Sequence, residues 1–223
     1  MNFFRKNFPP FIGFMIVVGW QYLYPSLEFL IPALKDNPYL ARSGEWLAVL
    51  LLLLVILVWE RRPLSSIGLR AMTWHDLLWG LAGFFVGIVT FVITNQIVRA
   101  LHLTTVGGTI SQQLNQTPIL VSLFTAFTAG VAEEILYRGF LIERLAAITG
   151  SLSWGAVIAF IAFVLMHLQF WGLGGLIQIG VWTLVVTGLY VWRRNLGACM
   201  LMHFLNDTFA LVLAPLLLAK FLR

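Results

Sequence analysis

The sequence predicts an all-α membrane protein, a polytopic bundle of about seven transmembrane helices (six to eight) with its active site inside the bundle. Hydrophobic residues make up 60% of the chain and charged residues 10%, whereas soluble proteins average about 45–50% and about 25%. The apolar runs are long and do not alternate with polar residues, which indicates helices rather than the strands of a membrane barrel. This composition excludes a water-soluble protein.

The first half of the chain contains three predicted spans, residues 8–24, 46–59 and 77–98. The first of them follows Arg5 and Lys6 as a signal peptide would, but no small-residue cleavage site comes after it, so we expect it to be retained. Residues 61–76 are too polar to cross a bilayer and are predicted to form a loop. Trp and Tyr at the ends of the first two runs suit the membrane interface.

The second half contains four predicted spans, residues 118–147, 153–170, 173–192 and 196–218. The first of these is longer than a straight crossing needs and is predicted to project from the membrane as far as Gly150. No repeat and no second domain is evident. We therefore expect one integral membrane domain, 1–223.

The basic residues are predicted to set the orientation. A net charge of +5 would suggest nucleic acid for a soluble protein, but here the basic residues sit in pairs beside apolar runs, so the expected partner is the lipid bilayer and not nucleic acid. With seven spans, eight basic residues share the side of the N-terminus and five lie opposite, which favours a cytoplasmic N-terminus. The eight are Arg5, Lys6, Arg61, Arg62, Arg70, Arg144, Arg193 and Arg194.

Ionisable residues inside the predicted spans are the candidate functional residues, because a charge at the bilayer centre costs from about 2.5 to more than 10 kcal/mol. Glu134 and Arg138 are one helical turn apart and are predicted to form an ion pair. Glu133 points about 100° away around the helix and lacks that partner, so it is available to hold a water or a metal. The alternative is a buried ion network that only joins helices.

Two later spans add further candidates. His203 and Asp207 lie on one face of the last span, with Asn206 at its edge, and can bind a metal together or donate hydrogen bonds to an oxyanion. His167 lies near the end of the fifth span. For a lone histidine, a hydrogen bond to a backbone carbonyl is the competing explanation, and the acids and the second histidine make it weaker.

Together these residues form three motifs. They are Glu133-Glu134-x-x-x-Arg138, Phe163-x-x-x-His167 and His203-x-x-x-Asp207. In type, spacing and order they resemble the CAAX-protease and bacteriocin-processing (CPBP or Abi) family of intramembrane proteases. The resemblance covers about residues 118–213, which we interpret as the catalytic core. One departure is Asp207, where many relatives have Asn.

The resemblance implies an endopeptidase that hydrolyses a peptide bond near the cytoplasmic side of the bilayer. In this interpretation Glu133 and His167 activate a water, and His203 with Asp207 or Asn206 faces the oxyanion, while Glu134 and Arg138 position their helix. The implied partner is a peptide or protein substrate. Prenylated C-terminal peptides suit some relatives and bacteriocin leaders suit others, and by analogy the location is a bacterial inner membrane.

Whether a cofactor takes part is left open by the sequence. Glu133, His167, His203 and Asp207 can form a tetrahedral site for a divalent metal such as zinc, and a metal-free glutamate mechanism is also credible. Two other classes of function remain as alternatives: a proton-coupled transporter, and a non-catalytic immunity or scaffold protein on the same helix bundle.

Overall fold

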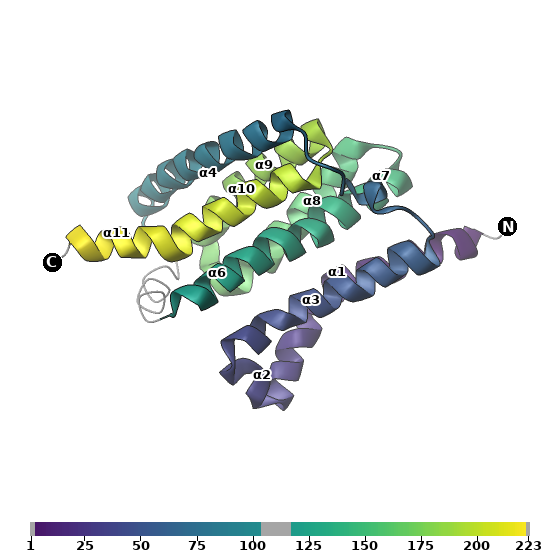
Figure 1. Ribbon diagram of the computed structural model, residues 1–223, viewed down its shortest axis with the longest axis horizontal. Helices are drawn as coiled ribbons and strands as arrows, with labels where there is room; N and C mark the ends of the chain where they lie inside the picture. The colour runs from purple at the N-terminus through teal and green to yellow at the C-terminus, as the bar shows by residue number, and fades with distance from the viewer. Residues whose placement is uncertain (1–2, 104–116, 222–223) are drawn as a thin grey trace.

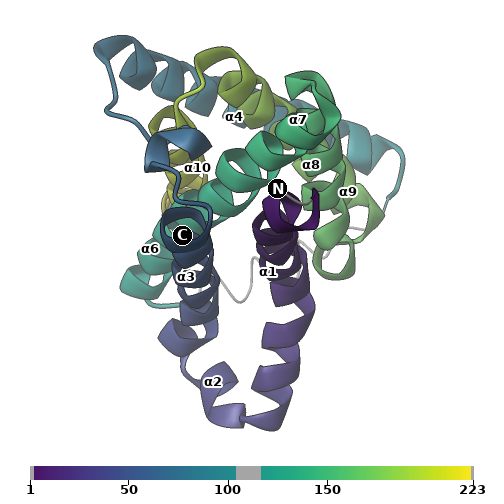
Figure 2. The ribbon, with the colours of Figure 1, turned by 90° about the vertical axis from the view of Figure 1, so that its right-hand side faces the viewer.

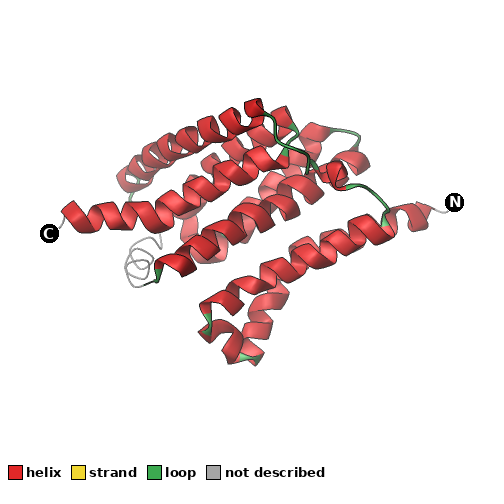
Figure 3. Ribbon diagram, in the orientation of Figure 1, coloured by secondary structure: helices red, strands yellow, loops and turns green. Residues whose placement is uncertain are grey.

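The computed structural model describes residues 3–103 and 117–221, and within them the chain forms helices without a strand (Figure 3). The all-α prediction is confirmed, and each predicted span falls on a helix. In chain order the elements are α1 (Phe3–Leu30), α2 (Pro32–Asp36), α3 (Pro38–Leu54), η1 (Val55–Trp59), η2 (Leu64–Ile67), α4 (Trp74–Ala100), α6 (Ile119–Thr128), η3 (Ala129–Leu141), α7 (Ile142–Thr149), α8 (Leu152–Met166), α9 (Leu168–Arg193), α10 (Leu196–Thr208), η4 (Phe209–Leu213) and α11 (Ala214–Phe221).

Five helical runs in the described part of the chain are long and apolar enough to cross a membrane: Pro38–Trp59, Trp74–Ala100, Ile119–Thr149, Trp171–Arg193 and Leu196–Leu217. The predicted first span lies in α1, which is not among the five. The predicted fifth span, 153–170, corresponds to the apolar helix α8, which has 15 residues. At about 1.5 Å per residue α8 is shorter than a hydrocarbon core of about 30 Å. The number seven is therefore approximate.

Helices α1 and α3 form a hairpin joined by the short helix α2. Its α2 end stands away from the other helices, as Figures 1 and 2 show. Asn37 begins α3 by accepting hydrogen bonds from the backbone N–H groups of Tyr39 and Leu40, a standard N-cap. The two helices approach closely at Gly44, where a Cβ atom would be 2.3 Å from the ring of Tyr24.

The other helices pack as a bundle in which α4 lies against α9 and α10. Glycines make this approach possible, because small residues let membrane helices come together. A Cβ atom at Gly80 would be 2.9 Å from the carbonyl oxygen of Ala198, and one at Gly87 would be 2.6 Å from Asn206 Oδ1. The position of α10, which carries the third motif, thus depends on the glycines of α4.

The central element is the run Ile119–Thr149, composed of α6, η3 and α7. Of its apolar window 56% is buried, more than in any of the other four runs. In η3 the turns widen to π-helical geometry, and the N–H of Ile142 donates to the carbonyl of Tyr137, five residues earlier. Such turns are frequent at functional sites. The run ends at Gly150, with φ +71°, as predicted.

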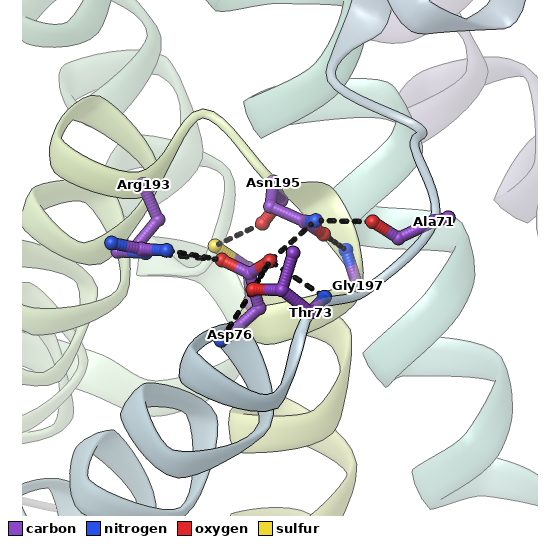
Figure 4. A network of polar contacts seen from close by, with 7 residues as sticks. Ala71, Thr73, Asp76, Arg193, Asn195 and Gly197 are labelled. Atoms are coloured by element: carbon purple, nitrogen blue, oxygen red, sulfur yellow. Dashed lines mark hydrogen bonds and ion pairs between the residues drawn. The ribbon is translucent and has the colours of Figure 1, made fainter.

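Ion pairs join the helices at one end of the bundle. Arg193 donates to Asp76 Oδ1 at 3.0 and 2.9 Å, and Asn195 Nδ2 donates to Asp76 Oδ2 at 3.1 Å and to the carbonyl of Ala71 at 3.2 Å (Figure 4). The Asn195 side chain also accepts from the N–H of Gly197. The turn between α9 and α10 is therefore fastened to the start of α4.

Helix α7 extends this set of contacts. Glu143 accepts hydrogen bonds from Tyr190 at 2.6 Å and from Arg194 at 2.7 Å. The neighbouring Arg144 donates to Glu60 at 2.6 to 3.1 Å. These contacts connect the end of the hairpin, the central run and the α9–α10 turn.

Candidate functional site

Glu134 joins the first and third motifs. Its Oε1 lies 2.8 Å from Arg138 Nη1 and 2.8 Å from His203 Nδ1, and all three side chains are at most 5% exposed. The predicted pair between Glu134 and Arg138 is present. The hydrogen bond to His203 was not predicted, and it brings α10 to η3.

Arg138 connects these residues to the second motif. Its guanidinium lies 4.1 Å from the centre of the Phe163 ring and 5.9 Å from a ring of Trp182. A guanidinium over an aromatic face is attracted by the ring quadrupole, more so away from water. Phe163 thus contributes the face on which Arg138 rests, and Arg138 joins the first motif to the second.

His167 follows the last residue of α8 and is half-buried. Its Nδ1 is 2.8 Å from the carbonyl oxygen of Phe163. A carbonyl only accepts, so Nδ1 carries the proton and Nε2 of the neutral ring is an acceptor. His167 also interacts electrostatically with Arg138, His203 and Asp207. A hydrogen bond to a backbone carbonyl, the competing explanation for His167, therefore accounts for Nδ1. It leaves Nε2 available to accept a hydrogen bond.

Glu133 is half-buried and has no hydrogen-bond partner among residues 3–103 and 117–221. It interacts electrostatically with His203, Asp207 and Arg138. The structure thus brings Glu133 near the third motif while leaving its carboxylate without a fixed donor.

Asp207 and Asn206 have different environments. Asp207 Oδ2 lies 3.6 Å from His203 Nε2, and its side chain is 30% exposed. Both ends of the Asn206 amide are engaged elsewhere, because Oδ1 accepts from Trp182 Nε1 at 3.0 Å and Nδ2 donates to the carbonyl of Phe84 at 3.0 Å. Of the two, Asp207 is the residue left facing His203, and Asn206 joins α10 to α4 and α9.

The four candidate metal ligands do not form a metal site in this structure. In the described part of the chain no three His, Cys, Asp or Glu side chains lie in an arrangement that would hold a metal ion. His203 has a carboxylate of the chain at each ring nitrogen, Glu134 at Nδ1 and Asp207 at Nε2. The positions of these residues therefore do not fit a tetrahedral divalent ion.

Glu45 is an acid of the site that sequence reasoning missed. It belongs to α3, its side chain is 18% exposed, and it interacts electrostatically with Glu133 and His203. The predicted second span began at residue 46, and Glu45 was not among the predicted site residues. Helix α3 begins at Pro38, which puts Glu45 well inside the helix.

Fold and site together define a membrane-type helix bundle in which a buried carboxylate, arginine and histidine from η3 and α10 are in contact. The family with the description Type II CAAX prenyl endopeptidase Rce1-like matches residues 115–209. This confirms the resemblance carried by the motifs, all of which lie within the matched residues. The hairpin of α1 and α3 lies outside them. No curated protein and no solved structure matched the chain.

Proposed function

We propose that the chain is an intramembrane endopeptidase that hydrolyses a peptide bond with a water activated by Glu133. The observation that carries the proposal is the contact of Glu134 Oε1 with both Arg138 and His203, which joins two motifs far apart in the sequence. The match of residues 115–209 to a family of endopeptidases supports the same reaction class.

Glu133 is the proposed general base. A base must reach the water that it deprotonates, and a carboxylate bound to a fixed donor is less available for this. Glu133 lacks such a donor among the described residues. Nε2 of His167 is proposed to accept a hydrogen bond from the same water and so to orient it. After attack on the carbonyl, Glu133 returns the proton to the leaving amine.

His203 is the proposed oxyanion-stabilising residue. As an imidazolium it donates from Nδ1 to Glu134 and from Nε2 toward the oxyanion, with Asp207 as its neighbour. Glu134 holds Nδ1 of His203, much as a carboxylate orients the histidine of a catalytic triad. Fixed donors aimed at the developing oxyanion lower the barrier because they need no reorganisation during the reaction. In this scheme Arg138 keeps Glu134 in place, and Asn206 keeps the helix of His203 in place.

The test is cleavage by the purified protein in detergent micelles. The first probe is a fluorescence-quenched peptide that ends in a prenylated CAAX sequence, because the matched family is described by that substrate; a bacteriocin leader peptide is the second. We expect Glu133→Gln and His167→Ala to lower kcat by about 10²–10⁴-fold, as loss of acid–base catalysis does. Glu28→Gln, an equal charge change in α1, is the control. Equal cleavage by wild type and Glu133→Gln would defeat the proposal.

The proposed orientation places the N-terminus in the cytoplasm and the site in the cytoplasmic half of a bacterial inner membrane. Arg144, Arg193 and Arg194 meet at one end of the bundle, and Arg61 and Arg62 follow η1 at that end, which supports this orientation by the positive-inside rule. An alkaline phosphatase fused to the N-terminus should then be inactive. High phosphatase activity would reverse the orientation.

A further inference from the structure

Glu45 has a carboxylate oxygen that the proposed chemistry does not use. Its Oε1 accepts a hydrogen bond from Arg42 Nη1 at 3.3 Å. Its Oε2 is buried and has no hydrogen-bond partner within the described residues. Leaving a buried acceptor without a donor is unfavourable, and more so when the acceptor is charged. This oxygen therefore requires a donor from outside the described residues.

Helix α3 holds Glu45 firmly against the central run. The next residue, Trp46, donates from Nε1 to Thr128 Oγ1 at 2.9 Å. The preceding residue, Gly44, lies against the ring of Tyr24 in α1. Because the backbone is fixed on both sides, the Glu45 carboxylate has a defined position beside η3.

The neighbours of this carboxylate belong to the candidate site. Glu45 interacts electrostatically with Glu133 and His203, and Tyr137 interacts with both acids. Two acids that interact in a poorly solvated region repel each other. Arg42 forms its hydrogen bond with Oε1 of Glu45 only. The ion pair therefore does not explain why Oε2 is buried.

A pocket of about 220 Å³ lies between α1 and the α8–α9 junction. It is lined by residues of α1 and of the α8–α9 junction: Gln21, Tyr22, Leu165, Met166 and Leu168. Tyr137 forms hydrogen bonds with Met166 and with Gln21, so the pocket adjoins the residue that also neighbours Glu45. A cavity of about 150 Å³ holds a benzene ring, and this pocket therefore has room for one large apolar side chain.

An extended peptide would satisfy both features. It presents backbone N–H donors, which need acceptors where water is scarce, and an ionised carboxylate only accepts. It also presents side chains at regular intervals, one of which can enter the pocket. A lipid tail would fill the pocket but would bring no donor for Glu45.

We propose that Glu45 is a substrate-binding residue whose Oε2 accepts a hydrogen bond from a backbone N–H of the peptide near the scissile bond, while an apolar side chain of the same peptide occupies the pocket between α1 and α8. The proposal rests on the endopeptidase function proposed above. It assigns substrate recognition to the α1–α3 hairpin, outside the residues that match the family.

Ester substrates test this hydrogen bond in the wild-type protein. Each backbone N–H of the peptide probe that flanks the scissile bond is replaced in turn by an ester oxygen, which removes one donor at a time. We expect KM to rise about tenfold at one position, equivalent to about 1.4 kcal/mol, with kcat within about twofold. A series in which no position changes KM by more than about twofold overturns the proposal.

Substitutions identify the acceptor. Glu45→Ala should raise KM for the amide peptide about tenfold and should abolish the sensitivity to the ester at that position, as expected for two groups that contact each other. Glu45→Gln keeps an acceptor oxygen and should have an intermediate KM, and Glu28→Gln should match wild type. If Glu45→Ala remains as sensitive to the ester as wild type, Glu45 is not the acceptor.

The two proposals fail in different ways. Wild-type cleavage by Glu133→Gln would defeat the endopeptidase mechanism whatever the ester series shows. A loss of cleavage in Glu133→Gln, together with an ester series that has no sensitive position, would defeat only the role of Glu45.

Discussion

Glu134 Oε1 accepts a hydrogen bond from His203 Nδ1 at 2.8 Å, between residues 69 positions apart in the sequence. Both side chains are almost fully buried, and Arg138 shares the same oxygen. The bond fixes which nitrogen of His203 carries a proton toward η3, and so determines how the other nitrogen is presented to the site.

Glu134→Gln should therefore lower kcat by about 10²–10⁴-fold with little change in KM, because His203 loses its orienting carboxylate. The measurement is steady-state cleavage of the peptide probe at a temperature well below unfolding. Glu143→Gln, an equal change in the same helical run, is the control and should keep its kcat. A kcat for Glu134→Gln equal to that of Glu143→Gln would contradict an orienting role.

Substitution of Asp207 is expected to change catalysis, whereas substitution of Asn206 is expected to change stability. Asp207→Ala should lower kcat by about 10²–10³-fold, because the oxyanion-stabilising His203 loses the carboxylate that lies 3.6 Å from its Nε2. Asp207→Asn should stay within about tenfold of wild type, since the related family often has Asn there. Asn206→Ala should instead lower the Tm, because Trp182 and the carbonyl of Phe84 each lose a hydrogen-bond partner. The reverse pattern, an active Asp207→Ala and a stable but inactive Asn206→Ala, would exchange their roles.

Gly130 should be sensitive to a single methyl group. A Cβ atom there would lie 2.9 Å from the backbone N of Phe204, next to His203, so Gly130→Ala must push α10 away from η3. We expect a lower Tm and a lower kcat/KM. Gly180 in α9 has no atom within 4 Å of its Cβ position, and Gly180→Ala should be neutral or stabilising by up to about 1 kcal/mol. If Gly130→Ala and Gly180→Ala unfold at the same temperature, α10 can move away from η3 without loss of stability.

The sequence predicted the helical fold and the motif residues because those depend on local properties. Apolar run length predicted where helices lie, and the spacing of four residues predicted the pair of Glu134 and Arg138. The partner of His203 depends on how η3 and α10 pack, and no local pattern specifies that.

Two boundaries also depended on packing. The apolar character continues from α8 into α9, so hydrophobicity did not show that α8 ends before His167. The non-helical backbone at Gly172, with φ +64°, lies inside the same apolar stretch. Glu45 was missed for a different reason. It is a single acid close to the polar N-terminal turns of α3, and hydrophobicity does not distinguish it from them. Only its position beside Glu133 reveals it as part of the site.

Arg144 and Glu60 should be the strongest test of the contacts that hold the end of the bundle. Both side chains are at most 4% exposed, with Nη2 to Oε2 at 2.6 Å, and Arg144 Nη1 also donates to the carbonyl of Ser66 at 3.2 Å. Arg144→Met leaves Glu60 buried and unpaired and should destabilise the protein by about 3–5 kcal/mol. The double variant Glu60→Gln with Arg144→Met removes both charges and should recover most of that loss, measured by thermal unfolding in detergent. Because this pair lies outside the site, the folded double variant should keep the wild-type kcat. If the double variant is no more stable than Arg144→Met alone, the two charges stabilise the fold independently of each other.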